Sequence, residues 1–99
     1  MTMIQRAGTA LTYKPAARFD FAACEALQSA FERELDTGFA TFTIDLANCA
    51  YIDSAALGML LYIDHVSGTD VAVRIVGVRG QVLDAVRKIH LDKVLNIVA

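Results

Sequence analysis

Hydrophobic and polar residues alternate between positions 41 and 46, where every second residue from Phe42 onward is apolar. This period of two is typical of a strand with one buried face. An apolar run without proline begins directly after Asp53 and Ser54, and it is long enough for a helix. The pattern therefore predicts a strand at 41–46 and a helix that starts at Ser54 and ends near Val66.

The same periodicities predict the other elements of the chain. Asp20 is a suitable N-cap for a helix whose apolar residues recur at helical spacing, and Gly38 is expected to end that helix in a left-handed conformation. The further predicted elements are a strand pair within 1–13 with a turn near Ala7 and Gly8, a loop at 14–19, a strand at 71–76, a helix after Gly80 and a short strand at 94–98.

Strands that alternate with helices need crossover connections, so this order predicts an α/β fold with a mostly parallel or mixed sheet. We expect a single domain over residues 1–99, in which three main helices pack on a four- to five-stranded mixed sheet, on one side or unevenly on both. The predicted core consists of Phe42, Ile44, Leu57, Leu60, Val73, Ile75, Val82 and Val86.

The composition argues against several classes of function. Nine basic and eleven acidic residues nearly balance and form no basic cluster, so nucleic acid is not an expected partner. Cys24 and Cys49 lack metal-ligand spacing and are expected to be reduced thiols, with Cys24 in the core stripe of its helix. With no signal peptide and no apolar run of transmembrane length, we expect a cytoplasmic protein without direct membrane insertion.

No motif in the sequence points to catalysis. A glycine-rich phosphate loop, a nucleophile elbow and the H-E-x-x-H motif are all absent from it. His65 and His90 are expected to have surface or structural roles, because His65 lies too far along its helix to activate Ser54. Asp45 and Asp53 flank a strand end, but a carboxylate pair without a further ligand does not suffice for a cation site. We therefore expect no catalytic residue, no metal and no cofactor.

Ser54 carries the strongest functional signal, and two interpretations of it are open. Serine is a favoured N-cap, so Ser54 can simply hold the start of the helix. At 100° per residue, however, Ser54 shares a sector of the helix with Gly58, Tyr62 and His65. A serine beside such small or polar residues can instead be a place that another protein approaches closely.

Two runs of sequence carry a family resemblance. They are Phe42-Thr43-Ile44-Asp45-Leu46 and Tyr51-Ile52-Asp53-Ser54-Ala55-Ala56-Leu57-Gly58. Together they resemble the core motif of STAS domains in the anti-sigma factor antagonist family, and the likeness extends over nearly the whole chain. Ser54 matches the phosphorylated serine of that motif, and Asp45 and Asp53 match its flanking aspartates. Ala55-Ala56 replaces the Ser-Gly of many members, and Ala17 replaces a glycine, but both changes leave the acceptor hydroxyl in place.

The resemblance implies a protein-binding switch rather than an enzyme. Such proteins bind a serine kinase that is also an anti-sigma factor while the serine is unphosphorylated, and they release it after phosphorylation. A PP2C-type phosphatase restores binding. An alternative is an accessory STAS subunit of a phospholipid ABC transporter, where the motif position is often threonine. A nucleotide-binding or hydrolase role is a further rival, but the phosphate-cradling loop that it needs is absent.

The contact surface for the partner is expected at the end of the sheet where Ser54 lies. Arg18 is either an ordinary solvated charge or part of that surface. The expected partner-binding residues are Arg18, Phe19, Asp53, Ser54, Gly58, Met59 and Tyr62.

Overall fold

The main sheet combines parallel strands with one antiparallel edge strand. The computed structural model describes residues 4–98, and within them the sheet has the strand order β1-β2-β4-β6-β7. β1 runs antiparallel to β2, and the strands from β2 to β7 are parallel neighbours. A small second sheet pairs β3 with β5 in parallel. The strands are β1 (Ile4–Ala7), β2 (Ala10–Tyr13), β3 (Arg18–Phe19), β4 (Thr41–Asp45), β5 (Tyr51–Ile52), β6 (Ala72–Val76) and β7 (Ile97–Val98).

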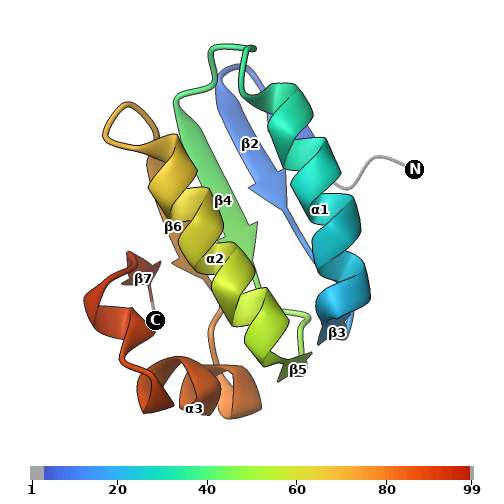
Figure 1. The fold of residues 1–99 in the computed structure, drawn as a ribbon, viewed down its shortest axis with the longest axis vertical. Coiled ribbons are helices and arrows are strands. Elements are labelled where there is room, and N and C mark those ends of the chain that lie inside the picture. The colour runs from blue at the N-terminus through green and yellow to red at the C-terminus, as the bar shows by residue number, and fades with distance from the viewer. Residues whose placement is uncertain (1–3, 99) are drawn as a thin grey trace.

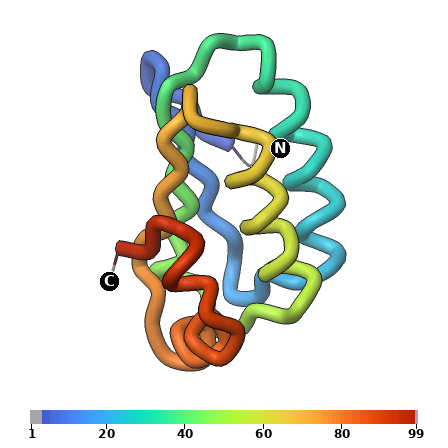
Figure 2. The backbone as a smooth tube through the Cα atoms, turned by 60° about the vertical axis from the view of Figure 1, so that its left-hand side comes forward, coloured from blue at the N-terminus to red at the C-terminus, as the bar shows by residue number. Residues whose placement is uncertain are grey.

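Helical segments make the crossovers that parallel strands require. α1 (Phe21–Glu34) and α2 (Ser54–Ser67) lie side by side over one face of the sheet (Figures 1 and 2). α3 (Gly80–Lys88) lies beyond the lower end of the sheet, in contact with β5 and with the single turn η1 (Leu91–Lys93). The predicted α/β fold, with a five-stranded mixed sheet and three main helices, is therefore confirmed, and α1 and α2 share one side.

Strand register places the large apolar side chains under α1 and α2. Phe42 on β4 lies opposite Leu11 on one neighbouring strand and Val73 on the other. The Phe42 ring meets Phe31 of α1 edge-on, with ring centroids 5.2 Å apart. All eight residues of the predicted core are buried. The alternation at 41–46 thus identified the covered face of the strand correctly.

The opposite face of the sheet is not covered by α1 or α2. Thr12, Thr43 and Arg74 form a row across β2, β4 and β6 in the strand register. The threonines are half-buried and Arg74 is exposed. These polar residues are the other half of the alternating pattern, as expected when a sheet buries one face and solvates the other.

Residues 14–19 differ from their prediction as a simple loop. The stretch ends in β3, which pairs with β5 in the register Arg18–Tyr51 and Phe19–Ile52. Neither two-residue strand is long enough to show a period of two, so only their pairing in the folded chain reveals them.

Two element boundaries also need correction. α1 ends at Glu34, because the Thr37 N–H donates to the Glu34 carbonyl at 3.0 Å and closes a tight turn. Gly38, with φ of 73°, lies beyond this turn and does not cap the helix. In the predicted strand at 94–98, only Ile97–Val98 is a strand. The strand pair at the other end is confirmed from Ile4 onward, and its residues 1–3 lie outside the described part of the chain.

Both cysteines are free and buried. Burial, and then the nearby carboxylates of Asp53 and Asp20, raise the pKa of the Cys24 thiol to about 11. A thiol with this pKa stays protonated near neutral pH and is a poor nucleophile. The interpretation of Cys24 as a core residue is therefore confirmed.

Residues 4–98 contain neither a membrane-spanning helix nor a cluster of metal ligands. No helix there has the length and apolar character needed to cross a membrane. No cluster of three or more His, Cys, Asp or Glu side chains suited to a metal ion occurs in that range either.

We predict that Leu60→Ala lowers the free energy of unfolding by about 2–5 kcal/mol, the usual cost of truncating a buried leucine. Leu60 is fully buried, whereas the adjacent Leu61 is 37% exposed. Leu61→Ala is therefore the matched control and should cost less than about 1 kcal/mol. Chemical denaturation of both variants measures the difference, and a loss below about 1 kcal/mol for Leu60→Ala would contradict the packing described above.

Candidate functional site

Asp53, rather than Ser54, caps α2. The Asp53 backbone is extended, with φ of −109° and ψ of 179°, and its Oδ1 accepts the Ala56 N–H at 2.9 Å. Ser54 is the first residue of the helix itself. The interpretation of Ser54 as a simple cap is therefore wrong, because the preceding carboxylate already occupies that position.

The second carboxylate oxygen of Asp53 joins α2 to α1. Its Oδ2 accepts the Phe21 N–H at 3.2 Å, at the first residue of α1. Asp20 caps α1 in the same manner by accepting the Ala23 N–H at 3.2 Å, as the sequence predicts. The first turns of both helices are thus tied together at one end of the molecule.

The small sheet sets this geometry. β3 leads into α1 and β5 leads into α2, so their parallel pairing brings the two helix starts to the same place. The chain continues the pairing one residue further, since the Asp53 N–H donates to the Phe19 carbonyl at 3.4 Å. Gln81 holds β5 from the other side by bonding the N–H and the carbonyl of Ile52 at 3.0 Å and 3.3 Å.

Ser54 is exposed at this end of the molecule. Residues four, seven and eleven positions later, Gly58, Leu61 and His65, are also exposed and continue the same outward stripe of α2. A Cβ atom added at Gly58 would meet nothing within 4 Å. The backbone at Gly58 is therefore open to solvent one helical turn after the serine, and a second protein could approach it closely.

Tyr62 does not belong to this stripe. Its hydroxyl donates to Glu32 Oε2 of α1 at 2.6 Å, and its ring packs edge-on against Phe31 with centroids 6.4 Å apart. The hydrogen bond from Tyr62, followed by the one from Gln28, lowers the pKa of Glu32, and the same Tyr62–Glu32 bond raises the pKa of Tyr62. Tyr62 therefore links α1 to α2, and Leu61 takes the outward position expected for it.

Phe19 and Met59 were expected on the contact surface, and for their side chains this is wrong. Phe19 is fully buried and packs against Tyr13 with ring centroids 5.7 Å apart. Met59 is 6% exposed. The β3 pairing turns Phe19 inward while its neighbour Arg18 points outward, and Met59 lies on the inner side of α2 between its exposed stripe and the sheet.

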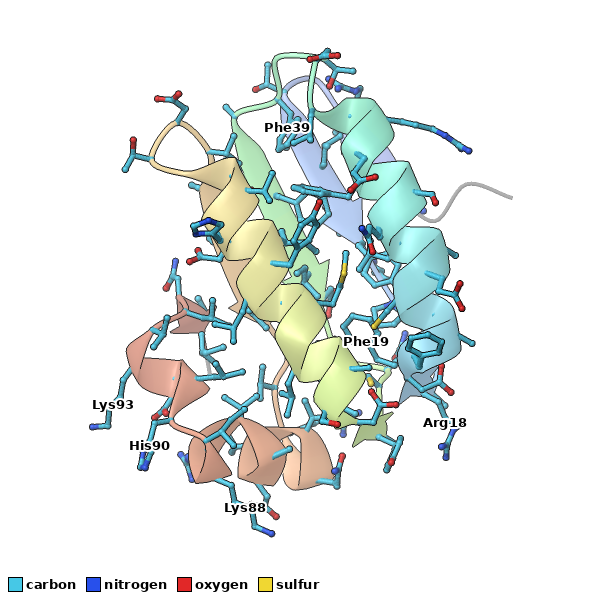
Figure 3. All side chains as sticks on the ribbon, viewed as in Figure 1. Arg18, Phe19, Phe39, Lys88, His90 and Lys93 are labelled. Atoms are coloured by element: carbon cyan, nitrogen blue, oxygen red, sulfur yellow. The ribbon has the colours of Figure 1, made fainter. Side chains whose placement is uncertain are left out.

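Arg18 is more than an isolated solvated charge. Its guanidinium carbon lies 4.3 Å from the centre of the Tyr51 ring, and its Nε lies 3.7 Å from Asp20 Oδ2. Figure 3 shows Arg18 at the end of the molecule where α1 and α2 begin. Arg18, Asp53, Ser54 and Gly58 are the predicted site residues that the fold brings together with accessible atoms.

Sequence reasoning missed Phe21, an exposed aromatic residue at this end. Phe21 begins α1, and its side chain is 64% exposed. The apolar spacing of α1 gives no reason to single it out, because Phe21 simply follows the cap residue. Only the Asp53 hydrogen bond shows that it lies beside the start of α2.

A hollow of about 220 Å³ adjoins the loop that leads into β5. Arg79 borders it and donates to the Ala47 carbonyl, and Gly77 allows close approach because a Cβ there would lie 2.6 Å from the Ala47 nitrogen. Asp45 supports the same loop by accepting the Ala47 N–H at 3.0 Å. The hollow is lined by Asn48, Cys49, Ala50, Arg79, Gly80 and Gln81.

Asp45 and Asp53, the aspartates that match the family motif, therefore bind backbone N–H groups and not a cation. Asp45 accepts from Ala47, while Asp53 accepts from Ala56 and Phe21. His65 is eleven residues beyond Ser54, about 16 Å along the helix axis at 1.5 Å per residue, so it cannot act as a base for that hydroxyl. His90 is exposed in a left-handed conformation, with φ of 60°, between α3 and η1.

Chemically, this end of the molecule offers an exposed hydroxyl at a helix N-terminus. A phosphate group there would benefit from the helix dipole and from backbone N–H groups of the first turn. It would also lie next to the Asp53 carboxylate, which already occupies the Ala56 N–H. The site can therefore accommodate a phosphate, at the cost of a large local increase in negative charge.

Comparison with known proteins points to one domain type. The family model described as "STAS domain" matches residues 1–99. A STAS-domain containing protein of Pseudomonas aeruginosa strain UCBPP-PA14 is 40% identical over 67 residues, which are 67% of this chain and 65% of that relative. The match thus spans less than two thirds of the length of the relative.

Solved structures share the fold at low sequence identity. An anti-sigma factor antagonist from Mycobacterium paratuberculosis has a TM-score of 0.84 and 18% identity, over 98% of this chain and 83% of that one. The unphosphorylated form of the anti-sigma factor antagonist SpoIIAA has a TM-score of 0.73 and 12% identity, over 97% and 86%. A sulfate transporter family protein from Wolinella succinogenes has a TM-score of 0.78 and 13% identity, over 91% and 74%.

We predict that alanine substitution lowers stability much more at Asp53 than at the adjacent Ser54. Asp53→Ala removes both the α2 cap and the link to α1, and should lower the free energy of unfolding by about 1–2 kcal/mol. Ser54→Ala should cost less than about 0.5 kcal/mol, because the side chain is exposed and is not the cap. Asp53→Asn is the control that keeps an oxygen acceptor and most of the stability. Urea denaturation measures all three, and a larger loss for Ser54→Ala than for Asp53→Ala would restore serine as the cap.

Proposed function

Because the chain belongs to the STAS domain family, we propose that it is an anti-sigma factor antagonist whose partner binding is controlled by phosphorylation of Ser54. In its unphosphorylated form it binds a serine kinase that also acts as the anti-sigma factor. Phosphorylation by that kinase ends the complex, and a PP2C-type phosphatase restores it. The protein would act in the cytoplasm together with these partners.

The observation that carries this proposal is that Asp53 and Ser54 have separate roles at the start of α2. Asp53 holds the helix start, while the Ser54 hydroxyl is exposed one residue later. A kinase can therefore modify the hydroxyl without removing a cap. The STAS resemblance adds to this, because Ser54 stands at the phosphorylated position of the family motif.

The physics of phosphorylation explains the release. A phosphate carries about −1.5 to −2 charges near neutral pH. A partner surface fitted to a neutral hydroxyl and to the bare backbone at Gly58 would meet bulk and charge, and would have to strip water from the phosphate. The helix N-terminus itself tolerates an anion, so binding should be lost while the fold survives.

A transport role is the second candidate. STAS domains also occur in transport proteins, as the likeness to the sulfate transporter family protein illustrates. An accessory STAS subunit of a phospholipid ABC transporter would co-purify with an ATPase, whereas a switch protein would co-purify with a small serine kinase. The serine at position 54 favours the switch, because threonine is frequent at this position in the transporter subunits.

We predict that Ser54→Ala binds the kinase constitutively, whereas Ser54→Glu binds it poorly. Alanine keeps a small neutral side chain that cannot be phosphorylated, and glutamate places negative charge beside Asp53. Isothermal titration of each variant with the purified kinase measures the affinity, and circular dichroism confirms that both are folded.

The wild-type protein provides the decisive comparison for this switch. It should bind the kinase before incubation with ATP, lose binding after Ser54 is phosphorylated, and regain it after phosphatase treatment. Phosphate found only at other residues, or affinity that does not change with phosphorylation of Ser54, would refute the proposal.

Substitution of Gly58 tests the contact surface separately from the switch. Gly58→Trp should fold, since space is open at this position, and should weaken kinase binding at least tenfold. Gly58→Ala is the control: it should retain binding and gain up to about 1 kcal/mol of stability from better helix propensity. Unchanged affinity of a folded Gly58→Trp variant would place the interface elsewhere.

A further inference from the structure

Phe21 is an aromatic side chain that the fold leaves in water. Its side chain is 64% exposed, although the inner face of α1 buries Cys24, Leu27 and Phe31. Aromatic residues are enriched among the anchors of protein–protein interfaces, because each brings a large apolar area with few rotatable bonds. The exposed ring therefore adds nothing visible to the core and is available to a partner.

Its position relative to Ser54 is fixed by a hydrogen bond. The Phe21 N–H donates at 3.2 Å to the Asp53 side chain, which immediately precedes Ser54 although Phe21 and Asp53 are 32 residues apart in the sequence. The Asp20 and Asp53 caps hold the first turns of both helices, so the backbone positions that carry the ring and the serine hydroxyl are held close together.

A second aromatic group extends the same surface. Tyr51 is 36% exposed, and the Arg18 guanidinium lies over its ring at 4.3 Å. Tyr51 pairs with Arg18 across β5 and β3, directly before the starts of α2 and α1. The residues that adjoin the two helix starts thus include the exposed aromatic side chains of Phe21 and Tyr51 and the charged side chain of Arg18, and aromatic residues and arginine are both enriched in protein interfaces.

Resting on the proposed function, we infer that Phe21 is the anchor by which the kinase that phosphorylates Ser54 docks. The partner must then present an apolar pocket that receives a phenyl ring, next to the site that receives the serine. The occupant is this kinase because the Phe21 N–H is bonded to the residue that directly precedes Ser54, so an enzyme that reaches the hydroxyl also comes close to the first turn of α1.

An anchor at this position also strengthens the effect of phosphorylation. A pocket that closes around Phe21 excludes water from the adjoining Asp53–Ser54 turn. A neutral hydroxyl enters such an environment at small cost, whereas a phosphate beside the Asp53 carboxylate does not. Binding through the ring and rejection of the phosphate are therefore two consequences of the same close approach.

The test begins by identifying the probe. A purified serine kinase is accepted if mass spectrometry shows that it transfers phosphate from ATP to Ser54 of the wild-type chain, and if it binds this chain. If no kinase of the source organism does so, the proposed function fails, and the anchor fails with it because this kinase is its stated occupant.

The kinase is then titrated with variants of the full chain in the presence of a non-hydrolysable ATP analogue. Phe21→Ala should raise the Kd by 10- to 100-fold, and Phe21→Leu, which keeps an apolar side chain, should recover part of this loss. Val94→Ala is the matched control, because Val94 is also 64% exposed but lies after η1. Val94→Ala should bind within twofold of wild type.

Thermal unfolding followed by circular dichroism accompanies these titrations. The Phe21 variants should melt close to wild type, since the side chain is exposed. Wild-type affinity for Phe21→Ala, or an equal loss for Phe21→Ala and Val94→Ala, would overturn the anchor while leaving the Ser54 switch in place.

Discussion

One carboxylate, that of Asp53, organises the functional end of this protein. With one oxygen it caps α2 through the Ala56 N–H, and with the other it binds the first N–H of α1 at Phe21. Helix starts leave backbone donors without partners, so a side chain that satisfies donors of two helices stabilises both and fixes their relative position. The short β3–β5 pairing places the chain so that a single residue can make both contacts.

Because Asp53 caps α2, the side chain of Ser54 is not needed for the cap and can be modified. Ser54 can gain a phosphate without the loss of a cap, and the anion would meet the positive end of the α2 dipole. In the proposed switch, the energetic consequence of phosphorylation would therefore fall on the partner that covers the serine and not on the core. A stable domain with a chemically variable point on its surface is what a partner switch of the STAS type requires.

The long elements and the core were predictable because they follow from periodicity. Alternation in β4 and helical spacing in α1 and α2 depend only on which residues must leave water, and all eight predicted core residues are buried. Asp20 was predictable as a cap because the residue type and its position suffice. The family motif also located Ser54 and Asp53. The fold class and the centre of the candidate site could therefore be obtained from the sequence.

The surface around that centre was decided by the tertiary structure. β3 and β5 have two residues each, too few for any period, and their pairing turns Phe19 inward and leaves Arg18 on Tyr51. Tyr62 donates a hydrogen bond to Glu32 on another helix, and a helical wheel of α2 alone cannot predict a contact with α1. Phe21 lies beside Asp53 through a contact over 32 residues of sequence. The sequence by itself determined most of what is buried along the long elements, because apolar residues recur there with the period of the strand or helix. Which exposed residues lie near one another depends on the tertiary structure, because the β3–β5 pairing brings the starts of α1 and α2 together.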